Sequence, residues 1–360
     1  MSIETEIVVA KRPEAELEVV AKSPLPKSRR IPALDFTKGT LVLLMVLYHW
    51  VNYFVGGEWP YYKYLRFLTP SFIFITGFMI SNVYLSKYAA SDPKLAKRLF
   101  TRGLKLLIVF LGLNVGRALL IPLLGTGALA ERPLDPSNLF AVFVSGNLPV
   151  TGNKLIAFSI LVPIAYLLML SGLLMVPYRR WRYIFHFVCA AFLASIAVLA
   201  LTGSGSYNLE FIAIGMLGVL TGFVSIDAIN EFITRPVLLA LAYLGYVIAI
   251  TYWNVPFLLL AAGTFLSLSG IFLLGTIIGE RGRTGREIVR LGQYSLFGYI
   301  SQIAILQILS VGFRHVHLTL PVLAFSFIAA FALTVMSVEA VHWARAKAAG
   351  VDTLYRLIFA

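Results

Sequence analysis

The sequence is poor in cysteine and in charged residues. Cys189 is the only cysteine among 360 residues, so no disulfide can form within the chain and no cysteine cluster can hold a metal. Asp, Glu, Lys and Arg make up 13% of the residues, whereas a soluble domain carries roughly 25%. Apolar residues make up 59%, and the mean hydropathy is +0.84. These values predict an all-α membrane protein with several spans, because helices satisfy their own backbone hydrogen bonds in lipid.

Acidic residues and converging metal ligands are also scarce. The net charge is +13, but the basic residues lie in short blocks between apolar runs, a distribution typical of orientation in a membrane. We therefore exclude nucleic acid as a partner. No compact set of His, Cys, Asp and Glu appears, so no metal site is predicted. No internal repeat is evident, which argues against a transporter built from inverted repeats.

Apolar runs long enough to cross roughly 30 Å of hydrocarbon occur ten times. An eleventh run, 138–148, is too short to cross and is predicted to be re-entrant or interfacial. Pro70 and Gly77, within the second run, predict a close contact between helices or a kink. The ten predicted spans cover 36–56, 66–86, 100–124, 155–177, 183–202, 208–226, 236–253, 256–279, 289–312 and 319–342.

The charges of the connecting segments predict the orientation of the spans. With the N-terminus in the cytoplasm, most of the 30 Lys and Arg residues fall in cytoplasmic segments, and every cytoplasmic loop is basic. We expect both termini to be cytoplasmic. The predicted organisation is a disordered tail over 1–30, a transmembrane domain over 31–345 and a C-terminal tail over 346–360.

A histidine lies inside the first predicted span. An imidazole at membrane depth has no bulk water around it, so His49 is expected to face a cavity or a partner and marks a functional site. Asn52 and Tyr53 follow at i+3 and i+4 and therefore share its face. Two alternatives stay open: a hydrogen bond between helices, and a place in the interfacial belt beside Trp50.

Basic residues gather at the start of the third predicted span. Arg102 and Lys105 are three residues apart and project from one face, with Arg98 one turn earlier. They could bind an anion, or their side chains could extend to the lipid headgroups as ordinary membrane-flanking charge. Further along this span, Asn114 and Arg117 also share a face, and they could line a cavity.

Two segments carry a resemblance to a known family. Ala33-Leu-Asp-Phe-Thr-Lys-Gly39 continues to His49 with ten residues between Lys38 and the histidine, and 291–302 reads Leu-Gly-Gln-Tyr-Ser-Leu-Phe-Gly-Tyr-Ile-Ser-Gln. Together they resemble the membrane acyltransferase-3 family, with its heparan-glucosaminide N-acetyltransferase-like and glucan-modifying relatives. Lys38 stands where the family usually has Arg, and Gln302 stands where many members have His.

The resemblance implies an acyltransferase of the bacterial inner membrane, in contact with membrane lipids. Assembly as a homo-oligomer stays open. Its co-substrate would be acyl-CoA, expected to be acetyl-CoA, and its acceptor a hydroxyl or amine of a sugar or glycolipid. His49 would be the general base, assisted by Asn52. The basic residues would hold the nucleotide phosphates: Lys38, Arg98, Arg102 and Lys105. The other expected substrate-binding residues are Asn114, Arg117, Tyr294 and Ser295.

Several functional alternatives stay open from the sequence. Asn52, Arg117 and Tyr294 are candidates for stabilising the oxyanion of the reaction. Acceptor recognition is expected in 125–154 and the short outer loops. The rival functions are a transporter or flippase for a sugar or lipid, and a catalytically inactive relative that serves as a scaffold.

Overall fold

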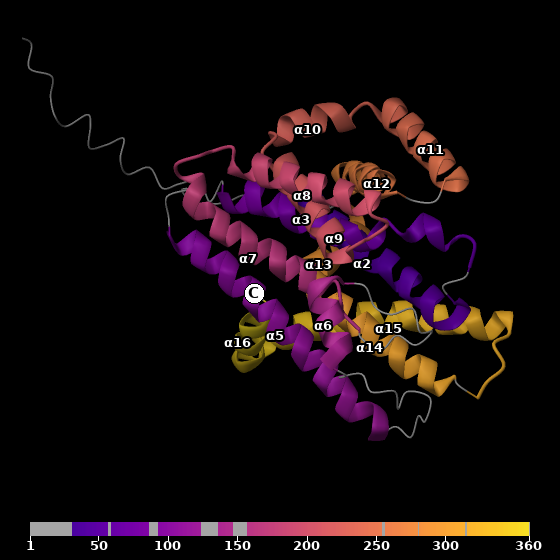
Figure 1. The fold of residues 1–360 in the computed structure, drawn as a ribbon. Coiled ribbons are helices and arrows are strands. Elements are labelled where there is room, and N and C mark those ends of the chain that lie inside the picture. Colours follow the sequence, from indigo (N-terminus) through magenta and orange to yellow (C-terminus); the bar gives the residue numbers. More distant parts are fainter. Residues whose placement is uncertain are drawn as a thin grey trace, which may run out of the picture. The chain divides into compact units, whose positions relative to one another are not determined.

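The computed structural model describes residues 31–56, 59–85, 93–123, 136–146, 157–253, 256–279, 281–313 and 315–359. The predicted tail over 1–30 and most of the segment 125–154 lie outside these residues. Within the described ranges every regular element is a helix, as the hydropathy predicts. Figure 1 shows how these helices are arranged.

The helices follow the apolar runs of the sequence. Short π-helical turns extend two of them: η2 (Val51–Val55) follows α2, and η4 (Ile80–Tyr84) follows α3. A separate 3₁₀ turn, η3, covers Tyr62–Leu65. The α-helices are α2 (Pro32–Trp50), α3 (Leu68–Met79), α5 (Pro93–Leu123), α6 (Pro136–Val144), α7 (Leu161–Tyr178), α8 (Ile184–Leu201), α9 (Tyr207–Gly222), α10 (Ile226–Ile233), α11 (Pro236–Tyr252), α12 (Phe257–Ile277), α13 (Gly282–Gln293), α14 (Ser295–Gly312), α15 (Leu320–Lys347) and α16 (Ala349–Phe359).

The chain is a multi-pass membrane protein. In the described residues, eight helices are long and apolar enough to cross a membrane, or nine if α9 and α10 together form one broken span. The axes of α9 and α10 meet at 102°, and α11 has only 17 residues. The count of ten spans and the cytoplasmic location of both termini therefore stay predictions.

Two predicted spans differ from the helices at their ends. The sixth span, 208–226, ends early, because Ser225 caps the new helix α10 and turns the chain after Gly222. The ninth span, 289–312, begins late, because α13 ends at Gln293 and Tyr294 separates it from α14. The short run 138–148 forms α6, a helix of nine residues.

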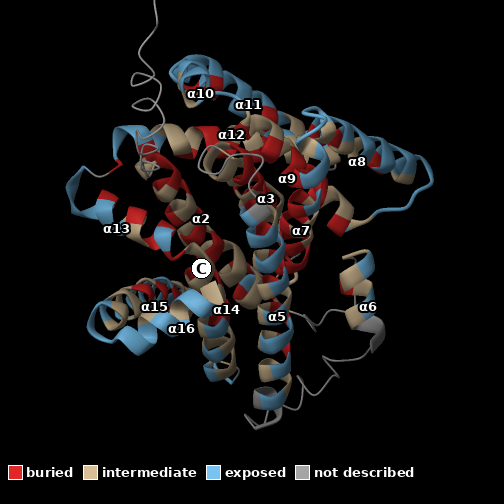
Figure 2. Cartoon of the chain, turned by 90° about the vertical axis from the view of Figure 1, so that its left-hand side faces the viewer, coloured by how far each residue is buried: buried red, intermediate tan, exposed pale blue. Residues whose placement is uncertain are grey.

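Buried residues concentrate on a central group of helices. Figure 2 shows them gathered on α2, α3, α7 and α9, while α8, α11 and α16 are mostly exposed. The outer helices carry exposed apolar side chains, which a membrane would cover with lipid. Cys189 of α8 is 1% exposed and belongs to the main hydrophobic core.

Glycines let α2 approach α13 very closely. A Cβ atom added at Gly292 would lie 1.7 Å from the carbonyl oxygen of Asp35, and one added at Gly39 would lie 2.0 Å from that of Ile288. These two glycines belong to the two segments that carry the family resemblance. The fold therefore brings the two segments together by direct backbone contact. The contact predicted at Gly77 is confirmed, since a Cβ there would lie 1.9 Å from a carbonyl of α9.

The C-terminal segment forms a helix that ion pairs hold beside α15. Asp352 of α16 pairs with Arg345 at 2.6 Å and with Arg356 at 2.7 Å. The Arg345 guanidinium also lies over the ring of Tyr355, 4.0 Å from its centroid. The expected tail over 346–360 is thus mostly the helix α16, fixed at its start.

Candidate active site

A large polar cavity lies at the C-terminal end of α2. This His49 cavity has a volume of about 880 Å³. Residues 157–160, the first turn of α9 and part of α14 complete its wall. Both polar and aromatic side chains line it, including His49, Asn52, Tyr62, Arg66, Tyr207, Glu210 and Tyr299. His49 thus lines a cavity, which is one of the environments expected for it.

A second, smaller cavity lies toward the N-terminal end of α2. This basic cavity has a volume of about 200 Å³ and is lined by Lys38, Arg102 and Ser295, among others. Tyr355 and Phe359 of α16 also line it. Burial raises the pKa of Tyr355 to about 12, so its hydroxyl stays neutral beside the two cations.

The two cavities share part of their walls. Tyr299 of α14 and Ile160, just before α7, line both of them. Lys38 and His49 are 11 residues apart on α2, which corresponds to roughly 16 Å along the helix. A group that passed from the basic cavity to the His49 cavity would therefore have to pass these two side chains.

His49 is held at its cavity by residues of α14. Its Nδ1 lies 3.4 Å from the amide nitrogen of Gln302, and its ring centroid lies 5.9 Å from that of Tyr299. Gln302 is fully buried, and its Oε1 has no hydrogen-bond partner among the residues that the structure describes. The residue at the position of the family's late histidine thus contacts the first histidine directly.

Asn52 lines the His49 cavity, with its amide engaged in hydrogen bonds. The Nδ2 group donates to the hydroxyl of Tyr62 at 2.8 Å and to the carbonyl of Tyr48 at 3.3 Å. The rings of Tyr48 and Tyr62 stack with centroids 5.0 Å apart. Asn52 therefore helps to shape the cavity wall around His49.

The predicted basic residues divide between the cavity and the surface. Lys38 reaches the basic cavity and forms an ion pair with Asp35 at 2.6 Å. Arg102 also lines the cavity, donates a hydrogen bond to the Tyr84 hydroxyl and lies over the Tyr84 ring. Arg98 is exposed and Lys105 half-buried, and neither lines the described cavity.

The other expected substrate-binding residues lie in different places. Asn114 is buried and connects α5 to Ala157. Its side-chain NH₂ group donates to the Ala157 carbonyl, and its side-chain oxygen accepts from the Ala157 backbone N–H, each at 3.1 Å.

Arg117 interacts electrostatically with Tyr53 but lines neither cavity. The Tyr294 hydroxyl lies 3.0 Å from Nδ1 of His342, facing α15. Of this set, Ser295 lines a cavity.

The structure adds residues that the sequence interpretation did not place in the site. Glu210 lies near the start of the sixth predicted span, and it lines the His49 cavity from the first turn of α9. Arg66 and Tyr207 lie around the same cavity. The sequence feature that could have identified Glu210 is its carboxylate within a predicted span, because an ionisable residue there indicates a functional site. Nothing in the sequence spacing relates these residues to His49.

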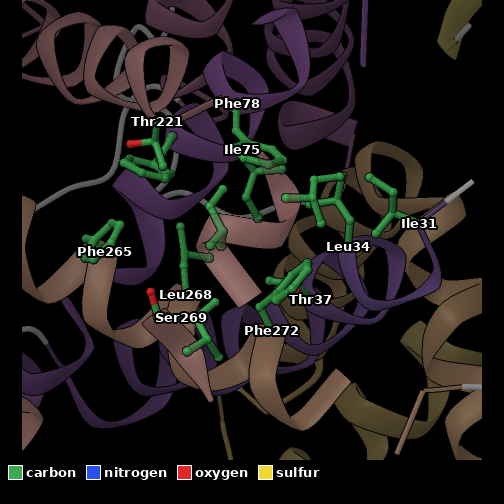
Figure 3. A pocket seen from close by; sticks show the side chains of 14 residues that line it. Ile31, Leu34, Thr37, Ile75, Phe78, Thr221, Phe265, Leu268, Ser269 and Phe272 are labelled. Carbon is green, nitrogen blue, oxygen red and sulfur yellow. The ribbon is translucent and has the colours of Figure 1, made fainter. Parts of the chain in front are cut away.

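A third cavity offers no group for chemistry. It measures about 60 Å³ and lies between α2, α3, α9, α10 and α12. Figure 3 shows the aromatic and aliphatic side chains around it, such as Phe78, Phe265 and Phe272. Its described lining contains no ionisable side chain.

Comparisons with known proteins give no family for the chain. No protein-family model matches it, and the searches of curated proteins and of solved structures found no match. Among the described residues, no group of three or more His, Cys, Asp or Glu side chains could hold a metal ion. The function is therefore argued from the two cavities and their residues.

Proposed function

We propose that the protein is a membrane acyltransferase of the acyltransferase-3 type. It would transfer an acyl group, expected to be acetyl, from acyl-CoA to a hydroxyl or amine of a sugar or glycolipid, in the inner membrane of a bacterium. The observation that carries this proposal is the pair of cavities that meet at Tyr299, one with cations and the other with His49. This arrangement lets two substrates approach one point from opposite sides.

The acyl donor would enter through the basic cavity. Lys38 and Arg102 offer charge-assisted hydrogen bonds to phosphate oxygens. The volume of about 200 Å³ is below the ~300–1,000 Å³ of typical ligand pockets. We therefore assign this cavity to the thioester arm, with the nucleotide nearer the exposed Arg98. The ion pair with Asp35 orients Lys38 but reduces its net attraction for phosphate.

The acceptor would occupy the His49 cavity. Its volume of about 880 Å³ and its mixed polar and aromatic wall suit a ligand with hydroxyl groups and an apolar ring face. Glu210 and Asn52 lie on this wall, and the carboxylate of Glu210 can accept hydrogen bonds from sugar hydroxyls or an amine.

His49 would act as the general base on the acceptor. A positioned base contributes typically about 10²–10⁴-fold to the rate. The contact with Gln302 at Nδ1 orients the ring at the cavity wall, and His49 would act on the acceptor through Nε2. Gln302 can accept from Nδ1–H after a half-turn of its terminal amide, since amide oxygen and nitrogen have the same shape. In that orientation the neutral imidazole carries its lone pair on Nε2.

The test is thiol release from acetyl-CoA. The purified protein, supplied with a lipid and glycan extract of the source cells, should release free CoA thiol. His49→Ala should lower this rate by about 10²–10⁴-fold. His317→Ala is the control, because His317 is exposed and lines neither cavity. A wild-type protein without thiol release, or an active His49→Ala variant, contradicts the proposal.

The same pair of cavities also favours a second candidate, a transporter for a sugar or lipid. Two cavities that share Tyr299 and Ile160 in their walls resemble a closed passage, and substrate could cross when these side chains move. Transport without thiol release, unaffected by His49→Ala, would support the transporter. Acyl transfer requires thiol release that depends on His49.

A further inference from the structure

Tyr299 occupies the point where the acyl donor and the acceptor would meet. It is 6% exposed and lines both the basic cavity and the His49 cavity. Its ring contacts that of Phe158, with centroids 6.2 Å apart, as well as the ring of His49 at 5.9 Å. A thioester entering from the basic cavity must place its carbonyl beside this side chain before the acyl group reaches His49.

The hydroxyl of Tyr299 is available for hydrogen bonding to a ligand. It makes no hydrogen bond with any described residue, and it is not among the fully enclosed polar atoms that lack a partner. It is therefore reached from cavity space. Tyr48 and Tyr53, on the His49 side, are close enough to interact with it electrostatically.

The oxyanion donors expected from the sequence are occupied elsewhere. Both amide hydrogens of Asn52 are used, one by Tyr62 and one by the carbonyl of Tyr48. Tyr294 faces His342, and Arg117 lines neither cavity. A tetrahedral intermediate of acyl transfer nevertheless needs a positioned donor for its negative oxygen.

We infer that Tyr299 is a catalytic residue that donates its hydroxyl hydrogen bond to the oxyanion of the tetrahedral intermediate. The acceptor oxygen or nitrogen forms a bond to the thioester carbonyl carbon, the carbonyl π electrons move to oxygen, and His49 takes the acceptor proton. The oxyanion then reforms the C=O bond, the C–S bond breaks, and the CoA sulfur leaves with the proton from His49. The products are the acylated acceptor and free CoA.

This inference rests on the proposed function, and its test is Tyr299→Phe. The variant keeps the ring that separates the cavities and removes only the donor. We expect kcat for acetyl-CoA turnover to fall about 100- to 1,000-fold, with KM for acetyl-CoA unchanged. The control is Tyr246→Phe, which removes a buried hydroxyl of α11 that lines neither cavity, and it should keep the wild-type kcat.

A binding measurement keeps the test independent of turnover and reports whether the variant is folded. Tyr299→Phe should bind CoA as tightly as the wild type. It should bind a trifluoromethyl ketone analogue of acetyl-CoA, whose ionised hydrate mimics the oxyanion, about 10- to 150-fold more weakly, because a lost hydrogen bond to a charged group is worth about 1.5–3 kcal/mol. Equal affinities for the analogue, or an unchanged kcat, overturn the role of Tyr299. A wild-type protein that releases no thiol instead overturns the proposed function itself.

Discussion

The contact between Gln302 and His49 joins two residues that are 253 positions apart. Gln302→Leu would keep most of the side-chain volume and remove the amide beside Nδ1. A hydrogen bond in this setting contributes about 1 kcal/mol, so we expect thiol release to fall about fivefold. The rate of CoA thiol release by the purified variant measures this effect.

A loss of folding would also lower that rate, so the melting temperature of Gln302→Leu must be measured alongside it. Gln302→His introduces a ring nitrogen that can contact Nδ1 of His49. This variant should retain more activity than Gln302→Leu. Full activity in Gln302→Leu would show that the amide does not support His49.

The sequence identified single residues that are polar or ionisable inside a predicted membrane span. His49 and Asn52 share a helix face, and that spacing predicts their common cavity. The separation of Tyr294 from Ser295 could not be predicted. The backbone between α13 and α14 directs Tyr294 to α15 and Ser295 to the basic cavity, and only the fold defines that break. Glu210 was missed because its distance from His49 in the sequence says nothing about their common cavity.

The packing of α13 on α2 depends on the absence of side chains at the crossing. Gly292→Ala would place a Cβ 1.7 Å from the carbonyl oxygen of Asp35, a contact that both helices would have to move to relieve. Overpacking typically costs about 1–3 kcal/mol. We therefore expect a lower melting temperature in detergent and a weaker affinity for CoA, since Asp35 pairs with Lys38 in the basic cavity.

Gly112→Ala is the matched control for this substitution. It lies in the helix α5, and a Cβ added there meets no atom within 4 Å. Alanine favours a helix by about 1 kcal/mol relative to glycine, so this variant should be at least as stable as the wild type. A Gly292→Ala protein as stable as Gly112→Ala would contradict the close crossing.

The attachment of α16 is expected to depend on pH through Asp352. The hydrogen bonds from Arg345, together with the charge of Arg356, hold the pKa of Asp352 below its ordinary value of 3.8. Because the folded pKa is the lower one, the stabilising effect is complete above the unfolded pKa and is lost as the pH falls through the folded value. Amide hydrogen exchange over 349–359 should therefore increase, beyond its intrinsic pH dependence, only in strongly acidic solution.

Asp352→Asn should show increased exchange of α16 already at neutral pH. Asp227→Asn offers the comparison, because Asp227 is in the first turn of α10, away from this contact. Unchanged exchange in Asp352→Asn would mean that packing of Tyr355 and Phe359 at the basic cavity holds the helix without the ion pairs.

Hydropathy predicts where helices lie but not how they bend. The apolar runs at 208–226 and 289–312 give no sign of the turn after Gly222 or of the break at Tyr294, because caps and backbone geometry act over single residues. The close approach of α2 and α13 could not be predicted either, because a glycine in an apolar sequence can occur for many structural reasons. The helical class itself follows from composition alone.

The two cavities become visible only in the whole molecule. Each is assembled from helices distant in the sequence, and Tyr299 belongs to both. Sequence motifs located one residue of each cavity, Lys38 and His49, because both lie on α2. The barrier between them comes from α14 and from the segment before α7, which no pattern along α2 can predict.

The orientation of the whole molecule can be tested with introduced cysteines. If ten spans cross the membrane, Ser204→Cys and Thr319→Cys should react with an impermeant thiol reagent in intact cells. Thr234→Cys should react only after the membrane is opened. Reaction of all three from the outside would contradict the predicted topology. It would indicate that neither the α9–α10 pair, whose axes meet at 102°, nor the short helix α11 crosses the membrane.

Cys189 of α8 is buried, so thiol reagents in solution do not reach it in the folded protein. Since the chain has no other native thiol, two spin labels can be attached, one beside each cavity, in an otherwise unaltered protein. The measured distance between the two labels would then report any displacement of α14. A change in that distance when CoA is added would report the opening of the route past Tyr299.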